Sequence, residues 1–245
     1  MGLSVVINTV FCYTEQSETS LMAAGNHFTY LNNMKTIVLI LFLLLPFHIS
    51  ADSFKLQAGD LIFQESCSGD MGKAIKEVTS SIDQYHFTHV GMVYIDENDS
   101  IYVIEATHPR VAVTPLHEYL YPENNKGCYP VSVVGRLKAE YQYCISRAIQ
   151  EGFTLVGKEY DDGFVMNNDK YYCSEFIYQI LLRANNGTAI FPLNVMTFKS
   201  PGSDEITEGW KEYFDKLHVP IPEGELGINP GAMSQSDVID IVHYY

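Results

Sequence analysis

The sequence predicts one domain of mixed helices and strands, and three observations lead to this prediction. Apolar residues make up 47% of the 245 residues, and 17 Tyr and 13 Phe supply large side chains for a core. Two runs typical of strands, 90–95 and 101–106, flank a short polar turn and predict a β-hairpin. Apolar residues recur at helical spacing along 174–184, which predicts a helix with one apolar face.

The remaining elements follow from turn signals and apolar spacing. The dipeptide Gly59-Asp60 is a turn signal before the first strand, and Asn185-Asn186-Gly187 ends the helix that precedes it. Short apolar runs predict further strands at 61–63, 111–113 and 129–137. Apolar residues at helical spacing predict further helices at 71–79, 140–153 and 210–217. The segment 192–245 is rich in turns and prolines, and we expect it to wrap over the core.

The N-terminal part has the features of an export signal. Lys35 precedes an apolar run from Ile37 to Phe47, and the small residue Ala51 follows it, which together predict a signal peptide over 34–51. The run is shorter than the roughly 20 apolar residues that span a bilayer. Because Met34 stands where an initiator belongs, we interpret 1–33 as a mis-called start, with a cytoplasmic tail as the alternative. A single catalytic domain is then expected at 52–245, in the periplasm or outside the cell, with no stable membrane anchor after cleavage.

Charge and cysteine content restrict the function further. The formal charge of −15 repels phosphate backbones, so nucleic acid is not an expected partner. The charge would favour a neutral or cationic substrate, and the alternative is that the acidic excess only maintains solubility. An exported chain tolerates disulfides. Four cysteines follow the signal: Cys67, Cys128, Cys144 and Cys173. If one of them must stay a free thiol, the other three can form at most one disulfide. The pairing among Cys67, Cys128 and Cys144 stays open.

Cys173 is the candidate nucleophile, because it directly precedes the helix predicted from Ser174. The unpaired N–H groups and the dipole at a helix N-terminus stabilise a thiolate. The same N–H groups can hold the oxyanion that forms when a thiolate attacks a carbonyl. A buried structural cysteine is the alternative interpretation of this residue.

His89 and Glu105 lie on the two strands of the predicted hairpin. With Ile95 and Ser100 flanking the turn, paired residue numbers sum to about 195, and a sum of 194 makes His89 and Glu105 direct neighbours. A carboxylate there would orient the imidazole and leave its second nitrogen for a thiol. A slip of one residue would move Glu105 to the opposite face.

Other polar residues are weaker candidates. An acidic, amide-rich loop with Asp161 and Asp162 precedes Cys173 and could bind a substrate ammonium, or it is a solvated loop. A metal site at the His86–His89 pair is less favoured, because zinc usually requires three or four ligands. The sequence contains no Walker A, GxGxxG or GxSxG motif, and we expect no metal and no cofactor.

Five motifs follow one another along the chain: Gly59-Asp60-Leu61-Ile62-Phe63, Thr88-His89-Val90-Gly91-Met92, Val103-Ile104-Glu105-Ala106, Tyr160-Asp161-Asp162 and Tyr171-Tyr172-Cys173-Ser174-Glu175-Phe176. This ordered set resembles the YiiX/YaeF-like family, the circularly permuted branch of the NlpC/P60 papain-like superfamily. The resemblance covers nearly all of 56–240. It implies an α+β, circularly permuted papain-like fold, in which a short antiparallel sheet packs against the catalytic helix.

The resemblance also implies a function. Cys173 would be the nucleophile, His89 the base and Glu105 the third polar residue of an exported cysteine hydrolase that cleaves amides, in cell-wall peptides such as peptidoglycan fragments or in related amides. Tyr172, Asp161, Asp162 and Asp60 lie in the matching motifs and are candidate substrate-binding residues. Two alternatives stay open: a lipid or ester hydrolase or acyltransferase of the same superfamily, and a binding module that has lost catalysis.

Overall fold

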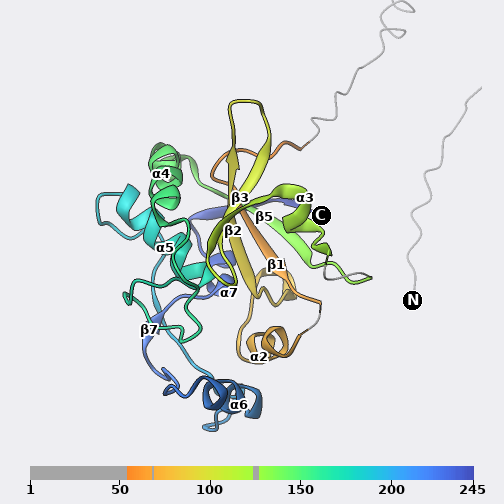
Figure 1. Ribbon diagram of the computed structural model, residues 1–245, viewed down its shortest axis with the longest axis vertical. Coiled ribbons are helices and arrows are strands. Elements are labelled where there is room, and N and C mark those ends of the chain that lie inside the picture. Colours follow the sequence, from red (N-terminus) through yellow and green to blue (C-terminus); the bar gives the residue numbers. More distant parts are fainter. Residues whose placement is uncertain (1–53, 68, 124–126) are drawn as a thin grey trace, which may run out of the picture. The chain divides into compact units, whose positions relative to one another are not determined.

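The computed structural model describes residues 54–67, 69–123 and 127–245 (Figure 1). The predicted start or tail at 1–33 and the predicted signal peptide at 34–51 lie outside these residues. No helix in the described part of the chain is long and apolar enough to cross a membrane.

A six-stranded antiparallel sheet forms the centre of the fold. Its spatial order is β4-β3-β2-β1-β5-β8, so that β1 and β2 lie in the middle. The predicted antiparallel sheet is therefore present. Its strands are β1 (Leu61–Glu65), β2 (His89–Ile95), β3 (Ile101–Ala106), β4 (Val111–Pro115), β5 (Val131–Leu137) and β8 (Ile239–Tyr244).

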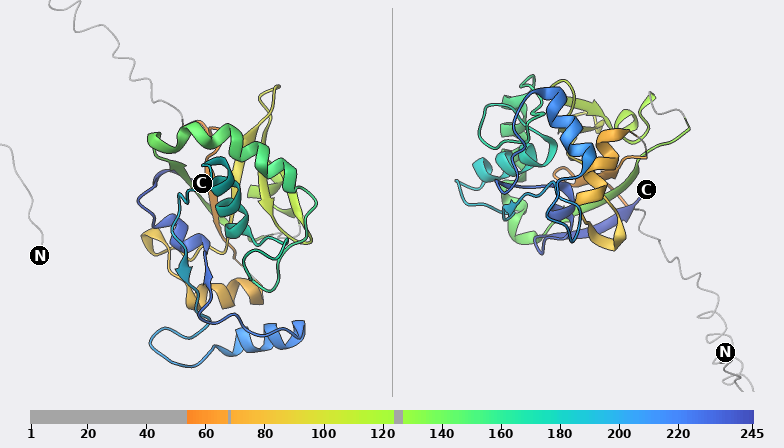
Figure 2. Two further views of the ribbon diagram at one scale, coloured as in Figure 1. Left: turned by 90° about the vertical axis from the view of Figure 1, so that its left-hand side faces the viewer. Right: turned by 90° about the horizontal axis from the view of Figure 1, so that it is seen from below.

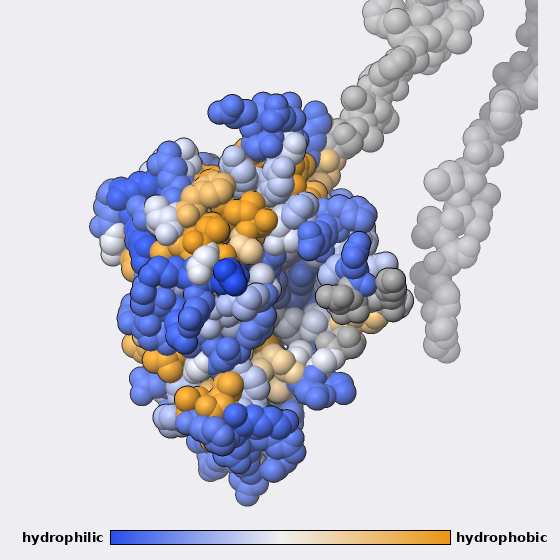
Figure 3. All heavy atoms as spheres, viewed as in Figure 1, coloured by the Kyte–Doolittle hydropathy of each residue, from blue (hydrophilic) through white to orange (hydrophobic). Residues whose placement is uncertain are grey.

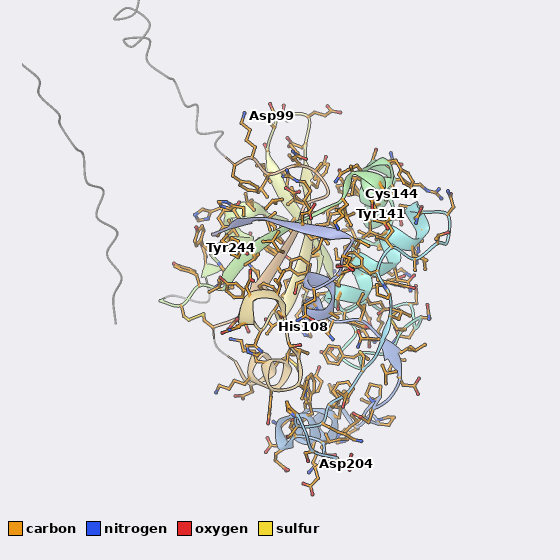
Figure 4. All side chains as sticks on the ribbon, turned by 180° about the vertical axis from the view of Figure 1, so that it is seen from behind. Asp99, His108, Tyr141, Cys144, Asp204 and Tyr244 are labelled. Carbon is orange, nitrogen blue, oxygen red and sulfur yellow. A yellow bond between two sulfur atoms is a disulfide. The ribbon has the colours of Figure 1, made fainter. Side chains whose placement is uncertain are left out.

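The β2–β3 hairpin forms where the polar turn predicts it. Asp96 accepts hydrogen bonds from the backbone N–H groups of Asn98 and Ser100, both at 2.8 Å, which closes the turn. Asp99 lies at the tip of this hairpin, at the far end of the domain from Asp204 (Figure 4). The register places Met92 opposite Ile104.

Helices cover the two faces of the sheet. α4 (Ile145–Leu155) and α5 (Cys173–Ala184) lie side by side on one face (Figure 2), and α5 is buried over most of its length because β2 and α4 enclose it. The short helix α3 (Leu116–Leu120) covers the other face, where Tyr119 packs against Ile62 and Val103. The predicted helix at 140–153 is in fact a 3-10 turn, Ala139–Cys144, followed by α4.

The C-terminal part contributes more than a wrap. A second small core joins α6 (Glu208–Leu217) to α2 (Asp70–Val78), and Trp210 Nε1 donates a hydrogen bond to Ala74 O at 3.1 Å. Two short elements, β6 (Asn194–Val195) and β7 (Leu226–Gly227), pair with each other ahead of α7 (Pro230–Ser234). The sequence pattern did not predict β8, which adds an edge strand beside β5.

Candidate active site

Cys173 is the first residue of α5. Tyr172 before it is extended (φ −88°, ψ 165°), and its side chain does not cap the helix, so the N–H groups of the first turn lie open beside the sulfur. Cys173 is 5% exposed, and its Sγ lies 4.0 Å from the carbonyl oxygen of Thr88, the residue before β2. The thiol therefore meets the start of β2 at the end of the sheet.

His89 is the first residue of β2 and lies between the thiol and a carboxylate. Its Nε2 is 2.5 Å from Glu105 Oε2, and the two side chains are 22% and 7% exposed. Burial lowers the pKa of His89, but hydrogen bonds to Cys173 and to Glu105 outweigh burial and raise the pKa to about 10. Because Nε2 faces Glu105, Nδ1 is the nitrogen left for the sulfur. The structure thus brings together the three side chains that the sequence singled out.

The predicted register of the hairpin needs a correction. The numbers of paired residues on β2 and β3 add up to 196, as in Met92 opposite Ile104. The same register places Gly91 opposite Glu105, so His89 is a diagonal neighbour of Glu105 and not its direct partner. A shift of two residues keeps Glu105 on the same face, and the diagonal distance is within reach of an imidazole. A Cβ on Gly91 would lie 3.3 Å from Glu105 Cβ and 2.3 Å from Val103 Cγ1, so the glycine gives the carboxylate its space.

Two residues that the sequence analysis missed complete the surroundings of the pair. Thr114 donates a hydrogen bond to Glu105 Oε1 at 2.5 Å and holds the carboxylate toward His89. The Tyr119 ring lies 5.8 Å from the His89 ring, and its hydroxyl donates to Ile62 O at 2.8 Å. Neither could be found from spacing alone, because β4 and α3 reach the site only through the β3–β4 pairing.

Asp60 is not part of the site, contrary to the prediction. It is 1% exposed and forms an ion pair with Arg136, with Nε to Oδ1 at 2.7 Å. It also precedes β1 at the end opposite Gln64, the residue that pairs with His89. The Asp60 carboxylate therefore links the start of β1 to Arg136 on β5 and is not available to a substrate at Cys173.

In the acidic loop before α5, the carboxylate of Asp161 bonds to the backbone of the loop itself. Asp161 is 3% exposed and accepts hydrogen bonds from the N–H groups of Gly163 and Val165, at 3.0 and 2.7 Å. This contradicts its prediction as a ligand for a substrate ammonium. Asp162 is partly exposed and contacts His108 at 3.3 Å and the Tyr213 hydroxyl, and its role in substrate binding stays a prediction.

Tyr172 lines a cavity beside the nucleophile, while its hydroxyl is occupied. The hydroxyl donates to Met166 Sδ and accepts from the N–H of Ile228, both at 3.3 Å, and burial raises its pKa. The cavity has a volume of about 220 Å³, and Cys173 forms part of its wall. Apolar side chains from α2, the acidic loop and the C-terminal part dominate the lining, among them Ile75, Val78, Phe164, Met196, Phe198 and Trp210.

Within the residues described, no group of three or more His, Cys, Asp or Glu side chains could hold a metal ion. His86, the partner of His89 in the less favoured metal site, instead contacts the backbone: its Nδ1 lies 3.0 Å from Thr79 O.

Comparisons with known proteins identify the family to which the chain is similar. A family model described as "Permuted papain-like amidase enzyme, YaeF/YiiX, C92 family" matches residues 55–243. The uncharacterized protein YiiX of Escherichia coli (strain K12) is 36% identical over 152 residues, which are 62% of this chain and 69% of YiiX. A crystal structure described as metalloprotein yiiX from Escherichia coli O157:H7 matches with a TM-score of 0.61 and 26% identity, covering 78% of this chain and 99% of that one.

Proposed function

Because the chain belongs to the YaeF/YiiX family of permuted papain-like amidases, we propose that it hydrolyses amide bonds with Cys173 as nucleophile, His89 as acid and base, and Glu105 as the orienting carboxylate. The observation that supports this proposal most is the position of the His89 imidazole, which touches the Glu105 carboxylate at 2.5 Å and follows Thr88, whose carbonyl oxygen lies 4.0 Å from the Cys173 sulfur. The fold itself permits many activities, so the proposal depends on these contacts.

The proposed reaction has two steps. The thiolate of Cys173 attacks the amide carbonyl, and the oxyanion binds to the N–H groups of the first turn of α5. The imidazolium of His89 gives its proton to the leaving amine as the C–N bond breaks, which leaves a thioester on Cys173. Neutral His89 then takes a proton from a water molecule as its oxygen attacks the thioester carbonyl. The C–S bond breaks, the Cys173 thiolate leaves, and the acid product is released with the imidazolium–thiolate pair restored.

The charge of His89 supports the first step. Its pKa of about 10 in the folded protein, against an ordinary 6.5, keeps the imidazole protonated at neutral pH as long as the sulfur and Glu105 are negative. The stabilisation from this raised pKa is fully present below pH 6.5 and is lost as the pH rises through about 10. The proton donor for the leaving amine is thus in place before the substrate arrives.

The test compares Cys173→Ala with Cys144→Ala, since both are buried free thiols among the residues described. Cys173→Ala should abolish the hydrolysis of cell-wall peptides, our proposed substrates, while its circular dichroism spectrum stays that of the wild type. Cys144 lies at the end of the 3-10 turn before α4, and Cys144→Ala should retain activity. Normal turnover by the Cys173 variant would refute the mechanism, and failure of a thiol-directed activity probe to label Cys173 would favour the binding module.

We further propose that the protein is exported, with cleavage after Ala51. The disulfide between Cys67 and Cys128 supports this, because such bonds persist in oxidising compartments. Protein recovered from the cell envelope or medium should begin at Asp52 by intact mass. It should show two thiols after denaturation and four after reduction, given the two free cysteines and the one disulfide. Four thiols before reduction, or a mass that includes residues 34–51, would argue against export.

A second candidate is the hydrolysis or transfer of an acyl group from an ester or lipid. The apolar lining of the cavity beside Cys173 favours it. The same thiolate and imidazole would act, with an alcohol in place of the amine as leaving group. Incubating the wild type and Cys173→Ala with muropeptides and with acyl lipids, followed by mass spectrometry of the products, separates the two candidates.

A further inference from the structure

The cavity beside Cys173 has an uncharged wall. Its lining includes apolar side chains from two helices, Ile75 and Val78 on α2 and Trp210 on α6. No Asp, Glu, Lys, Arg or His belongs to this lining among the residues that the structure describes, although the chain has a formal charge of −15. An ammonium or carboxylate group in the cavity would therefore lose its water without meeting an opposite charge in the wall.

The size of the cavity restricts what it can hold. Its volume is about 220 Å³. An apolar protein cavity of about 150 Å³ takes up benzene, whereas pockets that enclose drug-sized ligands measure about 300–1,000 Å³. One branched or aromatic side chain therefore fits, and a long acyl chain does not. The face drawn in Figure 3 is mainly hydrophilic, so an apolar group gains more by entering the cavity than by lying on that face.

The lining places the cavity on one side of the nucleophile. It includes Cys173 but neither His89 nor Glu105. In the proposed reaction the leaving amine takes its proton from His89, so this amine lies on the imidazole side of the sulfur. The cavity is then left for the acyl part of the substrate, the part that stays on Cys173 as a thioester.

One polar atom of the cavity wall lacks a partner. Asn194 belongs to the lining, and its Oδ1 is buried without a hydrogen bond to any described residue. Its Nδ2 donates to Val195 O at 3.2 Å, which identifies Oδ1 as the unsatisfied atom. A buried acceptor without a donor is costly. Turning the side-chain amide toward the cavity would allow an N–H of a ligand to supply the missing bond.

Asn194 is connected to the nucleophile by hydrogen bonds on both sides of Cys173. Ser174 Oγ donates to Ile228 O at 2.9 Å, and Ile228 N donates to the Tyr172 hydroxyl at 3.3 Å. Ile228 directly follows β7, and β7 pairs with β6, whose first residue is Asn194. The unsatisfied oxygen and the sulfur therefore belong to one connected part of the fold.

We propose that the cavity is the acyl-side specificity site of the amidase. It takes the uncharged, apolar side chain of the amino acid whose carbonyl is attacked, of the size of leucine or phenylalanine. Asn194 Oδ1 accepts the backbone N–H of the same amino acid. This deepens the proposed function and rests on it. A fatty acyl group carries no such N–H and would leave Asn194 unpaired, so the site favours a peptide over an acyl lipid.

The experiment compares kcat/KM for amides that share alaninamide as leaving amine and differ only in the acyl part. N-acetylleucyl and N-acetylphenylalanyl substrates should be cleaved about 10- to 100-fold more efficiently than the N-acetylglycyl substrate, the range expected for burying such a side chain. N-acetylglutamyl and N-acetyllysyl substrates should be no better than the glycyl one. The isocaproyl substrate keeps the leucine side chain but lacks its N–H, and it should lose roughly tenfold against N-acetylleucyl.

Three variants connect this ranking to the cavity, each checked for folding by circular dichroism. Asn194→Ala should remove the difference between the N-acetylleucyl and isocaproyl substrates. Ala232→Leu adds bulk to the wall and should lower the leucyl-to-glycyl ratio of kcat/KM. Val195 lines the cavity yet is 64% exposed, so Val195→Lys should fold and should raise glutamyl against leucyl cleavage. Val219→Lys, at a position that is 42% exposed and outside the lining, is its control and should keep the wild-type ranking.

The outcomes separate the specificity site from the amidase. Equal cleavage of leucyl, glycyl and glutamyl substrates, or the wild-type ranking in both Asn194→Ala and Val195→Lys, would overturn the site and leave the amidase in place. Most efficient cleavage of a palmitoyl substrate would identify a lipid ligand and overturn it as well. Calorimetry with the Cys173→Ala protein should show tighter binding of N-acetylleucinamide than of N-acetylglycinamide. The same preference in a wild-type protein that cleaves none of the amides would retain the site and refute the proposed function.

Discussion

Replacing Glu175 by glutamine should stabilise the protein above neutral pH and leave it unchanged in acid. Glu175 lies in the first turn of α5 and has no exposed surface. Its Oε1 accepts a hydrogen bond from Asn167 N at 3.0 Å, whereas its Oε2 has no partner among the atoms described. Burial, with a further contribution from the charge of Asp161, raises the pKa of Glu175 to about 7.

The magnitude follows from the two pKa values. The folded protein binds this proton more tightly than the unfolded chain, whose Glu has an ordinary pKa of 4.5. Stability is therefore unaffected below pH 4.5, falls as the pH rises from 4.5 to about 7, and stays reduced above that. The full penalty is on the order of 3 kcal/mol, at about 1.36 kcal/mol for each pH unit between the two values.

The neutral amide introduced by Glu175→Gln would imitate the protonated acid without this penalty. Thermal unfolding followed by circular dichroism should give the same melting temperature for wild type and Glu175→Gln near pH 4. Near pH 8 the variant should melt higher by roughly 6–12 °C, given about 2–4 °C for each kcal/mol in a chain of this size. Glu212→Gln, on the exposed face of α6, is the control and should shift neither value. A Glu175→Gln protein with the pH dependence of the wild type would refute the assigned burial cost.

Two further predictions concern the hairpin that carries the site. Gly91→Ala should destabilise the fold by about 1–3 kcal/mol in urea unfolding, because the new methyl would lie 2.3 Å from Val103 Cγ1; an unchanged midpoint would show that the strands give way freely. Glu105→Gln should lower kcat on the order of a hundredfold and move the upper limb of the pH–rate profile to lower pH, since one of the groups that raise the pKa of His89 is lost. A profile that keeps its upper limb would mean that Glu105 does not act through His89.

The chain order of the site separates local from distant contacts. The histidine and glutamate come from neighbouring strands of one hairpin, so their proximity needs only local pairing. The cysteine lies 84 positions after the histidine and reaches it only when α5 packs against β2. Variants in the hairpin should therefore affect the His–Glu contact, and variants at the interface of α5 with the sheet should affect the thiol.

The polar candidates show where reasoning from the sequence stops. Asp60 and Asp161 lie in two of the motifs that carry the family resemblance, yet both carboxylates form internal bonds, one to Arg136 and the other to backbone N–H groups. Sequence position says which residues are near in the chain, but not which hydrogen-bond partners the fold supplies. Burial of a charged group without such partners is too costly, so the fold uses these carboxylates itself.

The features that could be predicted from the sequence are those that depend on local physics. Alternation and turn residues predicted the hairpin, helical spacing predicted α5, and a cysteine at a helix start predicted a reactive thiol. The three-dimensional structure was needed for the exact register that sets Glu105 diagonally to His89 and for the support from Thr114. It was also needed for what depends on distant parts of the chain: the packing of α5 against β2, the cavity wall from α6, and the edge strand β8. Such contacts bring together residues far apart in the chain, and their energies come from packing that no single segment encodes.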